Sequence, residues 1–233
     1  MASPLYQVVI ETVVDRIATG VWPPGALLPS ETQLGAELGV SQGTARKALM
    51  ALEARGLVQR RQGRGTVVTL RTPDSALFHF FRLRRLDGSQ ARPELIREAV
   101  RCRRARRVER DALYGAPAKV FEIDRVRALD GRPSVVETSV VSAELFPGLD
   151  AQAPLPNTLY VHYQQAYRII VVRADEALRA VAADANVAAT LGRDLGTPLL
   201  AVDRRTIDVQ GRIVEWRRSV CATDAMTYQI ALE

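Results

Sequence analysis

The feature that most constrains this chain is a pair of short helices that the sequence predicts on either side of a tight turn. Ser30 and Gln33 have the spacing of a capping box, so a helix is expected to begin at residue 31. Gly39 ends that helix because glycine tolerates a left-handed backbone conformation. Ser41 then caps the next helix. Two helices joined in this way indicate a helix-turn-helix motif.

One more helix precedes this pair, and the last helix of the set has two different faces. Apolar residues recur with helical spacing between residues 5 and 17, and Gly20 marks the end of that stretch. The helix after Ser41 carries an apolar stripe formed by Ala45, Ala48, Leu49 and Leu52. Its other face carries Gln42, Thr44, Arg46 and Lys47. We expect the first face to be buried and the second to be exposed.

A short basic hairpin follows the helices. Residues 57–61 and 66–68 are predicted strands, and the glycine-rich residues 62–65 form the turn between them. From residue 55 to residue 71 the sequence holds no acid and five arginines, Arg55, Arg60, Arg61, Arg64 and Arg71. Helices followed by such a hairpin indicate a winged helix-turn-helix, in which the hairpin contacts phosphates while a helix enters the major groove. The alternative is that these arginines only solvate a hairpin.

The charge of the chain is compatible with a nucleic-acid partner. The formal net charge is +6, and 30 of the 32 basic residues are arginines. Planar guanidinium groups match phosphate and base acceptors, although a GC-rich coding bias explains an arginine excess equally well. The chain has 233 residues, of which 47% are hydrophobic and 25% charged, so wholesale disorder is excluded and one large or two modest domains are expected.

Other classes of protein are disfavoured by what the sequence lacks. No apolar run approaches the length of a membrane helix, and the first apolar stretch contains acids that a secretory signal would not. Cys102 and Cys221 are too few for a disulfide framework, and His79 and His162 are too few for a histidine-rich metal centre. We expect a cytoplasmic protein without a metal site or a cofactor.

The sequence changes character after residue 70. Residues 1–70 form the first predicted domain, 71–76 a turn-rich linker, and 77–233 a second domain made mostly of antiparallel strands. The strands are expected at residues 121–129, 134–141, 199–209 and 213–221, and a helix capped by Asp184 at 185–191. Residues 174–183 give conflicting signals, because their alanines favour a helix whereas residues 169–172 favour a strand.

Several motifs within residues 4–69 together resemble the GntR family of bacterial repressors. They are Leu5-Tyr6-Gln7, Pro23-Pro24-Gly25, Leu28-Pro29-Ser30-Glu31, Val40-Ser41 with Thr44 and Arg46, Leu52-Glu53 with Gly56-Leu57, and Gly63-Arg64-Gly65-Thr66. The resemblance implies that the third helix contacts bases and phosphates and that the wing glycines approach the minor groove. The residues expected to contact DNA are Ser30, Thr32, Ser41, Gln42, Gly43, Thr44, Arg46, Lys47, Arg60, Gln62, Gly63, Arg64 and Gly65.

The chain departs from that family at positions expected to face DNA. Thr32 and Gln42 stand where the family often has arginine, and Gly43 replaces a larger residue at a cost to the helix of about 1 kcal/mol relative to alanine. Glutamine pairs bidentately with adenine, whereas arginine prefers guanine. We therefore expect an operator that differs from the commonest half-site of the family.

The second domain resembles the UTRA effector-binding domain of the HutC subfamily. The residues that carry the resemblance are Val126-Arg127, Asp130-Gly131-Arg132-Pro133, Glu137, Leu145-Phe146-Pro147-Gly148-Leu149, Leu159-Tyr160 with Tyr163, Ala188 with Leu191-Gly192, Pro198-Leu199-Leu200 with Arg204, and Gly211 with Val214-Glu215. The implied fold is similar to that of chorismate lyase, an antiparallel sheet flanked by helices with a small-molecule cleft. The same resemblance favours a long strand running to about residue 182.

Two arginines in this domain are candidates for binding an anion. Arg125 and Arg127 share one face of a strand, where two guanidinium groups repel unless an anion lies between them. The alternative is a solvated pair, or one neutralised by Glu137 and Glu215. For Glu137 to share their face, we expect a three-residue turn closed by Gly131 as a bulge. The resemblance implies an effector site formed by His79, Phe80, Arg125, Arg127, Glu137, Thr158, Tyr160, Glu215 and Tyr228. For His79 a structural role is an equal alternative.

The sequence thus predicts an α+β protein, with a winged helix-turn-helix domain followed by a chorismate-lyase-like antiparallel-sheet domain. The expected function is a ligand-responsive repressor that binds a palindromic operator as a homodimer and responds to a small anionic metabolite. Two alternatives are a constitutive DNA-binding protein whose second domain only dimerises, and a lyase-like enzyme. The basic run from Arg101 to Arg110 is interpreted first as a solvated face, with a dimer or phosphate contact as the alternative.

Overall fold

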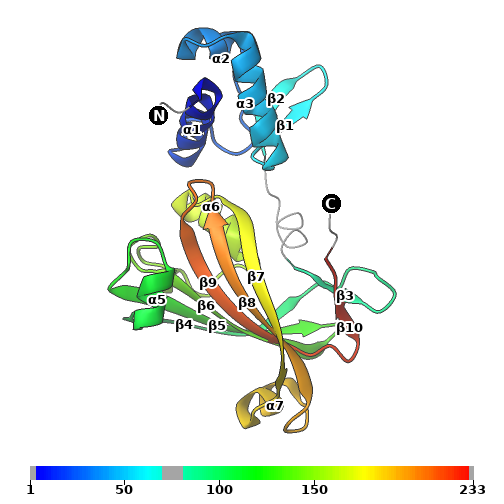
Figure 1. Cartoon of the computed structure of the whole chain (residues 1–233). Coiled ribbons are helices and arrows are strands. Elements are labelled where there is room, and N and C mark those ends of the chain that lie inside the picture. The colour runs from blue at the N-terminus through cyan, green and yellow to red at the C-terminus, as the bar shows by residue number, and fades with distance from the viewer. Residues whose placement is uncertain (1–3, 70–80, 231–233) are drawn as a thin grey trace.

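The computed structural model describes residues 4–69 and 81–230, which form a small helical unit above a larger sheet (Figure 1). We call residues 4–69 the head and residues 81–230 the body. The predicted linker at residues 71–76 and the predicted effector contacts His79 and Phe80 lie outside the described residues.

The head has the predicted order of three helices and a hairpin. Its elements are α1 (Leu5–Ala18), α2 (Glu31–Leu38), α3 (Gln42–Ala54), β1 (Val58–Arg61) and β2 (Gly65–Val68). The capping box is present, since the Ser30 hydroxyl accepts from the Gln33 backbone at 3.2 Å and the Gln33 side chain accepts from the Ser30 backbone at 2.9 Å. Ser41 caps α3 by accepting from the Thr44 amide at 3.1 Å. The predicted winged helix-turn-helix is confirmed.

The two helices of the motif are held close by a small residue. Gly35 on α2 faces the turn, and a Cβ atom at this position would lie 2.9 Å from the carbonyl oxygen of Val40. The predicted apolar stripe of α3 is buried against α1 and α2, and every one of its four side chains is at most 1% exposed. The packing of this stripe fixes the orientation of α3 relative to α1 and α2.

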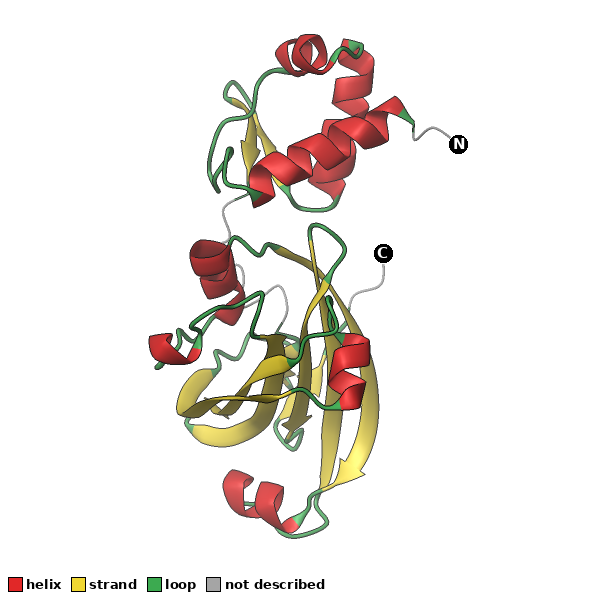
Figure 2. Cartoon of the chain, turned by 90° about the vertical axis from the view of Figure 1, so that its left-hand side faces the viewer, coloured by secondary structure: helices red, strands yellow, loops and turns green. Residues whose placement is uncertain are grey.

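The body is built on a six-stranded antiparallel sheet in the order β4-β5-β6-β9-β8-β7. Its strands are β4 (Glu94–Arg104), β5 (Lys119–Leu129), β6 (Arg132–Ser142), β7 (Val171–Ala182), β8 (Pro198–Asp208) and β9 (Ile213–Cys221). A second, two-stranded sheet pairs β3 (Leu83–Arg85) with β10 (Met226–Tyr228). The helical segments are α5 (Arg107–Ala112), η1 (Asp150–Gln152), α6 (Leu159–Tyr167) and α7 (Ala185–Leu191), and Figure 2 shows them outside the sheet. α6 packs on one face of the sheet, where Tyr160 and Tyr163 contact Glu215 of β9.

The conflicting signals at residues 174–183 resolve as a strand. The segment forms β7 and pairs with β8 along nearly its whole length, so cross-strand pairing overrides the helical propensity of alanine. The short helix α7 has the predicted bounds, with the Asp184 side chain accepting from the Val187 amide at 2.8 Å and Gly192 in the left-handed conformation.

The hairpin between β5 and β6 differs from the expected three-residue turn. Asp130 and Gly131 form a two-residue connection, with φ angles of 50° and 75° that belong to a type I′ turn. The register shifts further along, where Arg127 opposes Val135 but Ala128 opposes Pro133. The bulge therefore falls at Ser134 rather than at Gly131. Its effect is the one expected, because Arg125 and Glu137 are directly opposed and share one face.

Among the described residues, the head contacts the body through a small apolar patch and a hydrogen bond from Arg168. Ile170 is 6% exposed and belongs to the hydrophobic core of the head, with Val172 and Val209 packed beside it. The Arg168 guanidinium donates to the carbonyl oxygen of Thr19 at 2.5 Å, just beyond the end of α1. Arg168 is also the residue after α6, where it has a left-handed backbone with φ 57°. One residue thus links the end of α6 to the end of α1.

Candidate nucleic-acid interface and ligand pocket

The exposed end of α3 carries the side chains that were predicted to contact DNA. Gln42, Gly43, Arg46 and Lys47 are exposed, whereas Thr44 is half-buried and its hydroxyl lies 2.9 Å from that of Ser41. The start of a helix presents unpaired backbone N–H groups and a partial positive charge, which favour a phosphate. Polar side chains at this end can therefore reach base edges while the backbone contacts a phosphate.

A groove of about 580 Å³ runs between the start of α2, the start of α3 and the wing. It brings together residues from three separate segments of the head. They are Leu27, Leu28, Ser30, Glu31, Thr32, Gln33, Gln42, Arg60, Arg61, Gln62, Gly63, Arg64, Gly65 and Thr66. The groove thus brings together the predicted contacts on α2 and the wing with one from α3, whereas Ser41, Gly43, Thr44, Arg46 and Lys47 do not line it.

The wing arginines do not have equal roles. Arg60 forms an ion pair with Glu31 at 2.9 Å, and its backbone amide donates to Glu53 at 2.9 Å, so it ties the wing to α2 and α3. Arg61 and Arg64 are exposed, and neither makes an ion pair with any residue that the structure describes. These two guanidinium groups are the ones available to a phosphate. Lys47 lies 4.3 Å from the centre of the Tyr6 ring, a cation–π contact that orients it along α3.

The pair of arginines on β5 is neutralised inside the body. Arg125 is 1% exposed, and its guanidinium forms an ion pair with Glu98 at 2.5 Å and donates to the carbonyl oxygen of Pro156 at 3.0 Å. Arg127 pairs with Glu137 at 2.8 Å and also donates to the side chain of Asn157. The structure thus matches the alternative of a neutralised pair, with Glu98 in the place suggested for Glu215. No signal in the sequence marked Glu98 as that partner.

Glu215 is the centre of a second buried network. Its carboxylate accepts from the hydroxyl of Tyr163 at 2.8 Å and from that of Tyr160 at 3.1 Å, and it pairs with Arg217 at 3.0 Å. Burial raises the pKa of Tyr163 well above its usual value, and that of Tyr160 rises for the same reason. Burial opposes the charge of Arg217, but Glu215, Tyr160, Glu137 and Tyr163 together outweigh it, so the pKa of Arg217 also rises. The tyrosines are therefore neutral donors to the Glu215 carboxylate.

A small cavity of about 40 Å³ lies beside these networks, under the β3–β10 sheet. Its lining contains three arginines that were not among the predicted site residues, Arg82, Arg204 and Arg217. The full lining is Phe81, Arg82, Leu83, Val135, Glu137, Val202, Arg204, Arg217, Ser219, Cys221 and Tyr228. Arg204 pairs with Glu176 at 2.5 Å, and the hydroxyl of Tyr228 donates to the same carboxylate.

The predicted effector residues are only partly brought together by this cavity. Glu137 and Tyr228 line it, and Glu215 lies directly behind Arg217. Arg125, Arg127 and Thr158 do not, and Thr158 is half-buried at the start of α6. The period-two spacing that places Glu215 and Arg217 on one face of β9 was a signal that would have found Arg217.

The densest basic run of the sequence is largely paired within the fold. Arg101 pairs with Asp124 at 2.9 Å, and Arg103 pairs with Glu109 at 2.7 Å and contacts Glu122. Burial opposes the charge of Glu122, but the two arginines outweigh it and lower its pKa. These contacts favour the interpretation of the run as a structural, solvent-facing surface.

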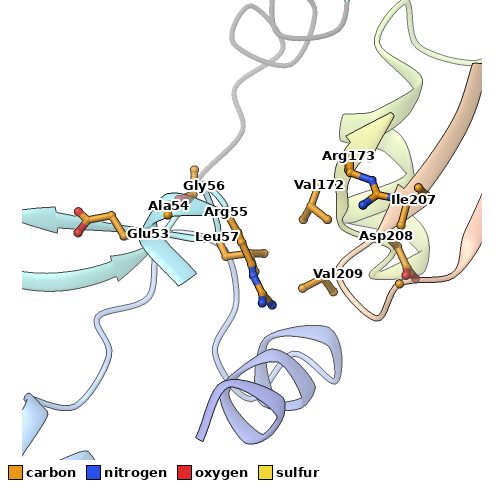
Figure 3. A pocket seen from close by; sticks show the side chains of 12 residues that line it. Glu53, Ala54, Arg55, Gly56, Leu57, Val172, Arg173, Ile207, Asp208 and Val209 are labelled. Atoms are coloured by element: carbon orange, nitrogen blue, oxygen red, sulfur yellow. The ribbon is translucent and has the colours of Figure 1, made fainter. Parts of the chain in front are cut away.

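A larger cavity of about 790 Å³ separates the head from the body beside their contact (Figure 3). Arg55, the residue after α3, points across it toward Val209 of the body (Figure 3). Arg173 and Asp208 line the opposite wall. The head therefore touches the body over a small area and leaves open space beside it.

Among residues 4–69 and 81–230, no helix is long and apolar enough to cross a membrane. In the same part of the chain, no three histidine, cysteine, aspartate or glutamate side chains are grouped so as to hold a metal ion.

Comparison with known proteins agrees with this architecture. Residues 5–68 match the bacterial regulatory proteins of the gntR family, and residues 105–227 match the UTRA domain. The transcriptional repressor NagR of Bacillus subtilis (strain 168) is 27% identical over 236 residues, with 97% of this chain and 93% of NagR covered. The transcriptional regulator GgaR of Escherichia coli (strain K12) is 28% identical over 235 residues, with 97% of this chain and 90% of GgaR covered.

Two solved structures are also similar to this chain. PhnF from Mycobacterium smegmatis is 27% identical with a TM-score of 0.57, and the match covers 96% of this chain and 99% of PhnF. The ligand-binding domain of a GntR-family regulator from Bordetella bronchiseptica is 30% identical with a TM-score of 0.60, covering 66% of this chain and 98% of that domain.

A winged-helix head joined to a small-molecule-binding sheet domain defines a class of transcriptional regulators that bind DNA with one domain and an effector with the other. This chain belongs to the GntR family of bacterial regulatory proteins, and its UTRA domain places it in the HutC subfamily. It is a regulator of transcription and not an enzyme, as expected, since NagR and GgaR are named as a transcriptional repressor and a transcriptional regulator.

Proposed function

We propose that the chain is a homodimeric, cytoplasmic repressor that binds a palindromic operator and is released when a small anionic metabolite binds beside Arg204 and Arg217. The observation that carries the DNA half of this proposal is the exposed start of α3 beside Arg61 and Arg64, which lack ion-pair partners among the described residues. One such head covers one half-site, and a second copy is needed to read the other half of a palindrome.

The effector half of the proposal rests on the charges around the cavity under β3 and β10. Arg204 and Arg217 supply positive groups, whereas Glu137 and the hydroxyl of Tyr228 supply an acceptor and a donor. This mixture suits a ligand with an anionic group and several hydroxyl or amine groups. We assign Arg125 and Arg127 a positioning role, because neither lines the cavity and their guanidinium groups pair with Glu98 and Glu137.

The cavity also indicates how a ligand would enter. At about 40 Å³ it is far smaller than an ordinary ligand site, so the β3–β10 cover must move to admit a metabolite. A ligand that pairs with Arg217 competes with Glu215 for that guanidinium. Glu215 holds Tyr160 and Tyr163 of α6, and α6 ends at Arg168, which contacts the head. These contacts connect Arg217 in the cavity, through Glu215 and α6, to Thr19 of the head.

Two measurements test the proposal with the full chain. Binding sites are selected from random DNA, and affinity for the selected fragment is measured at several salt concentrations. A panel of sugar phosphates, imidazole carboxylates and phosphonates is then screened by thermal shift, and each compound that stabilises the protein is added to the DNA-binding assay. A compound that raises the melting temperature and releases DNA supports the proposal.

Substitution Arg204→Gln provides the matched control. We expect this variant to bind the selected DNA like the wild type and to lose the response to the compound. A compound that stabilises the protein without changing DNA affinity would favour a constitutive DNA-binding protein instead, and failure to bind any DNA at low salt would overturn the DNA half.

A further inference from the structure

The cavity between the head and the body has the size of a small-molecule site and is separate from the proposed effector cavity. Its volume of about 790 Å³ falls within the range of about 300–1,000 Å³ that is usual for ligand pockets. The end of α3 and the residues after it form one wall, and the start of β7 and the end of β8 form the other (Figure 3). It shares no lining residue with the cavity under β3 and β10.

Apolar side chains line both walls of this cavity. Leu57 of the head and Ile207 of the body are buried, and Val172 and Val209 of the body are partly buried against the core of the head. Water beside such walls is displaced favourably by an apolar group. A ligand with an apolar part therefore fits this cavity better than a wholly polar metabolite does.

The two acidic residues of the lining are already paired within the fold. The Glu53 carboxylate accepts from the backbone amide of Arg60 at 2.9 Å. Asp208 is 1% exposed, pairs with the Arg212 guanidinium at 2.7 Å and accepts from the backbone amide of Gln210 at 3.0 Å. Neither carboxylate is left to attract a cationic ligand.

The two arginines of the lining come from opposite walls and leave an excess of positive charge. Arg55 makes no ion pair with any residue in the described part of the chain, and it points across the cavity toward Val209 (Figure 3). Arg173 has an exposed ion pair with Asp175 at 3.1 Å, which solvent screens. Because the carbonyl groups that end α3 repel an anion, an anionic group belongs near the body wall, to which Arg55 extends.

We propose that this cavity binds an amphipathic organic anion. Its carboxylate, sulfonate or phosphate group is bound by Arg55 and Arg173, and its apolar body lies against Leu57, Ile207 and Val209. The site is a second one, distinct in place and in ligand from the effector cavity, and it does not depend on the proposed repressor function.

A ligand in this cavity contacts the head and the body at once. It binds fully only when the head is docked, so its differential affinity favours the docked arrangement over one in which the head is free. The hydrogen bond from Arg168 to Thr19 belongs to the same junction. We therefore expect the bound anion to slow amide hydrogen exchange on both walls and at the end of α1.

The first measurement uses a fluorescent probe of this chemistry with the full chain. The dye 8-anilinonaphthalene-1-sulfonate carries one sulfonate on an aromatic body, and its fluorescence rises in apolar surroundings. We expect saturable binding, displaced by decanoate but not by inorganic phosphate at the same concentration and ionic strength. Displacement by phosphate as effective as that by decanoate would overturn the amphipathic ligand class, and the absence of saturable binding would overturn the site.

Arginine variants locate the probe. Arg55→Ala and Arg173→Ala are each expected to weaken dye binding roughly three- to tenfold, and the double variant to weaken it further. Both side chains are exposed, so the fold is retained. Arg179→Ala is the matched control, because Arg179 is equally exposed on β7 but does not line the cavity. Equal affinity in all these variants would show that the dye binds elsewhere.

A matched pair of substitutions at Ala54 tests the charge of the ligand. Ala54 is exposed, lines the cavity and is the last residue of α3. Ala54→Glu places a carboxylate in the cavity and is expected to weaken dye binding roughly as much as Arg55→Ala. Ala54→Gln has the same size without the charge and is expected to bind nearly as the wild type does. Equal losses in the two variants would overturn the anionic half of the proposal.

Hydrogen exchange separates a bridging ligand from one bound to a single wall. Saturating dye should slow exchange in residues 53–57 and in residues 207–211 of the wild type, and this protection should be lost in the double arginine variant. Protection of the head segment alone, or of the body segment alone, would overturn a site formed by both parts of the protein.

Discussion

The guanidinium of Arg168 donates a hydrogen bond to the carbonyl oxygen of Thr19, and these two residues close α6 of the body and α1 of the head. The Arg168 side chain also lies against Gly20, where an added Cβ atom would be 3.1 Å from the guanidinium carbon. This contact lies at the end of the helix whose tyrosines bind Glu215. It is a polar contact between the described parts of the head and the body.

Substitution Arg168→Gly is expected to loosen the head from the body without unfolding α6. Glycine adopts the left-handed backbone at this position more readily than arginine, so the end of α6 is preserved. The lost hydrogen bond is worth about 1 kcal/mol. Hydrogen exchange at the end of α1 should become faster, while exchange in the body strands stays unchanged. Arg168→Lys serves as the control that keeps the positive charge. Equal hydrogen-exchange protection of α1 in the wild type and both variants would show that Arg168 does not hold the head against the body.

The two kinds of wing arginine should respond differently to truncation. Arg61→Ala or Arg64→Ala should weaken DNA binding and reduce the slope of log affinity against log salt by about 1, because each removes one phosphate contact. Arg60→Ala should instead lower the melting temperature of the free protein, since Arg60 joins the wing to Glu31. Salt titrations of DNA binding and thermal unfolding of the free protein separate the two effects. An unchanged salt slope in both Arg61 and Arg64 variants would rule out their phosphate contacts.

Gln42→Arg is expected to change which base the protein prefers. Gln42 is exposed in the groove at the start of α3, where it can pair with adenine, whereas arginine pairs with the O6 and N7 atoms of guanine. Discrimination at the contacted position should shift by about 1–3 kcal/mol. Selection from a random DNA pool with the wild type and the variant provides the measurement. The same preferred sequence for both proteins would remove Gln42 from the base-contacting set.

The buried carboxylate of Glu137 should make stability depend on pH in the acid range. Burial disfavours its charge, but Arg127 and Arg217 outweigh burial and lower the pKa of Glu137 to about 2. A group whose folded pKa lies below its unfolded value of 4.5 stabilises fully above that value and loses this contribution as the pH falls toward 2. The contribution amounts to about 3 kcal/mol. Glu137→Gln should be less stable at pH 7, and its stability should fall less steeply below pH 4.5 in urea titrations.

Removal of the Tyr163 hydroxyl should destabilise the body. The Tyr163→Phe variant leaves the fully buried Glu215 carboxylate with one donor fewer, at a cost of about 1–3 kcal/mol in the free energy of unfolding. Tyr167→Phe on the same helix is the control, since that hydroxyl only accepts from the exposed side chain of Gln152. Chemical denaturation of both variants gives the comparison. Equal losses in the two variants would show that the Glu215 network is not a special source of stability.

The local structure of the head was predictable because its signals are local. A capping box, a left-handed glycine and a serine cap each involve residues three or four positions apart, and they fixed α2, the turn and α3. The strands of the β5–β6 and β8–β9 hairpins were also predictable, because alternating side chains and glycine turns are read within one hairpin. The bulge at Ser134 was not, since a three-residue turn and a two-residue turn followed by a bulge place Glu137 on the same face.

The sequence by itself determined the elements of the head, the two central hairpins of the body and the family, and it predicts which surface of the head faces DNA. The tertiary structure decided which charges meet. Arg125 pairs with Glu98, 27 residues away, and Glu215 meets hydroxyls on α6 that lie more than 50 residues away. Such pairings depend on strand order and helix placement, which bring distant residues within a few ångströms. Their energies depend on burial, which no short segment of sequence specifies.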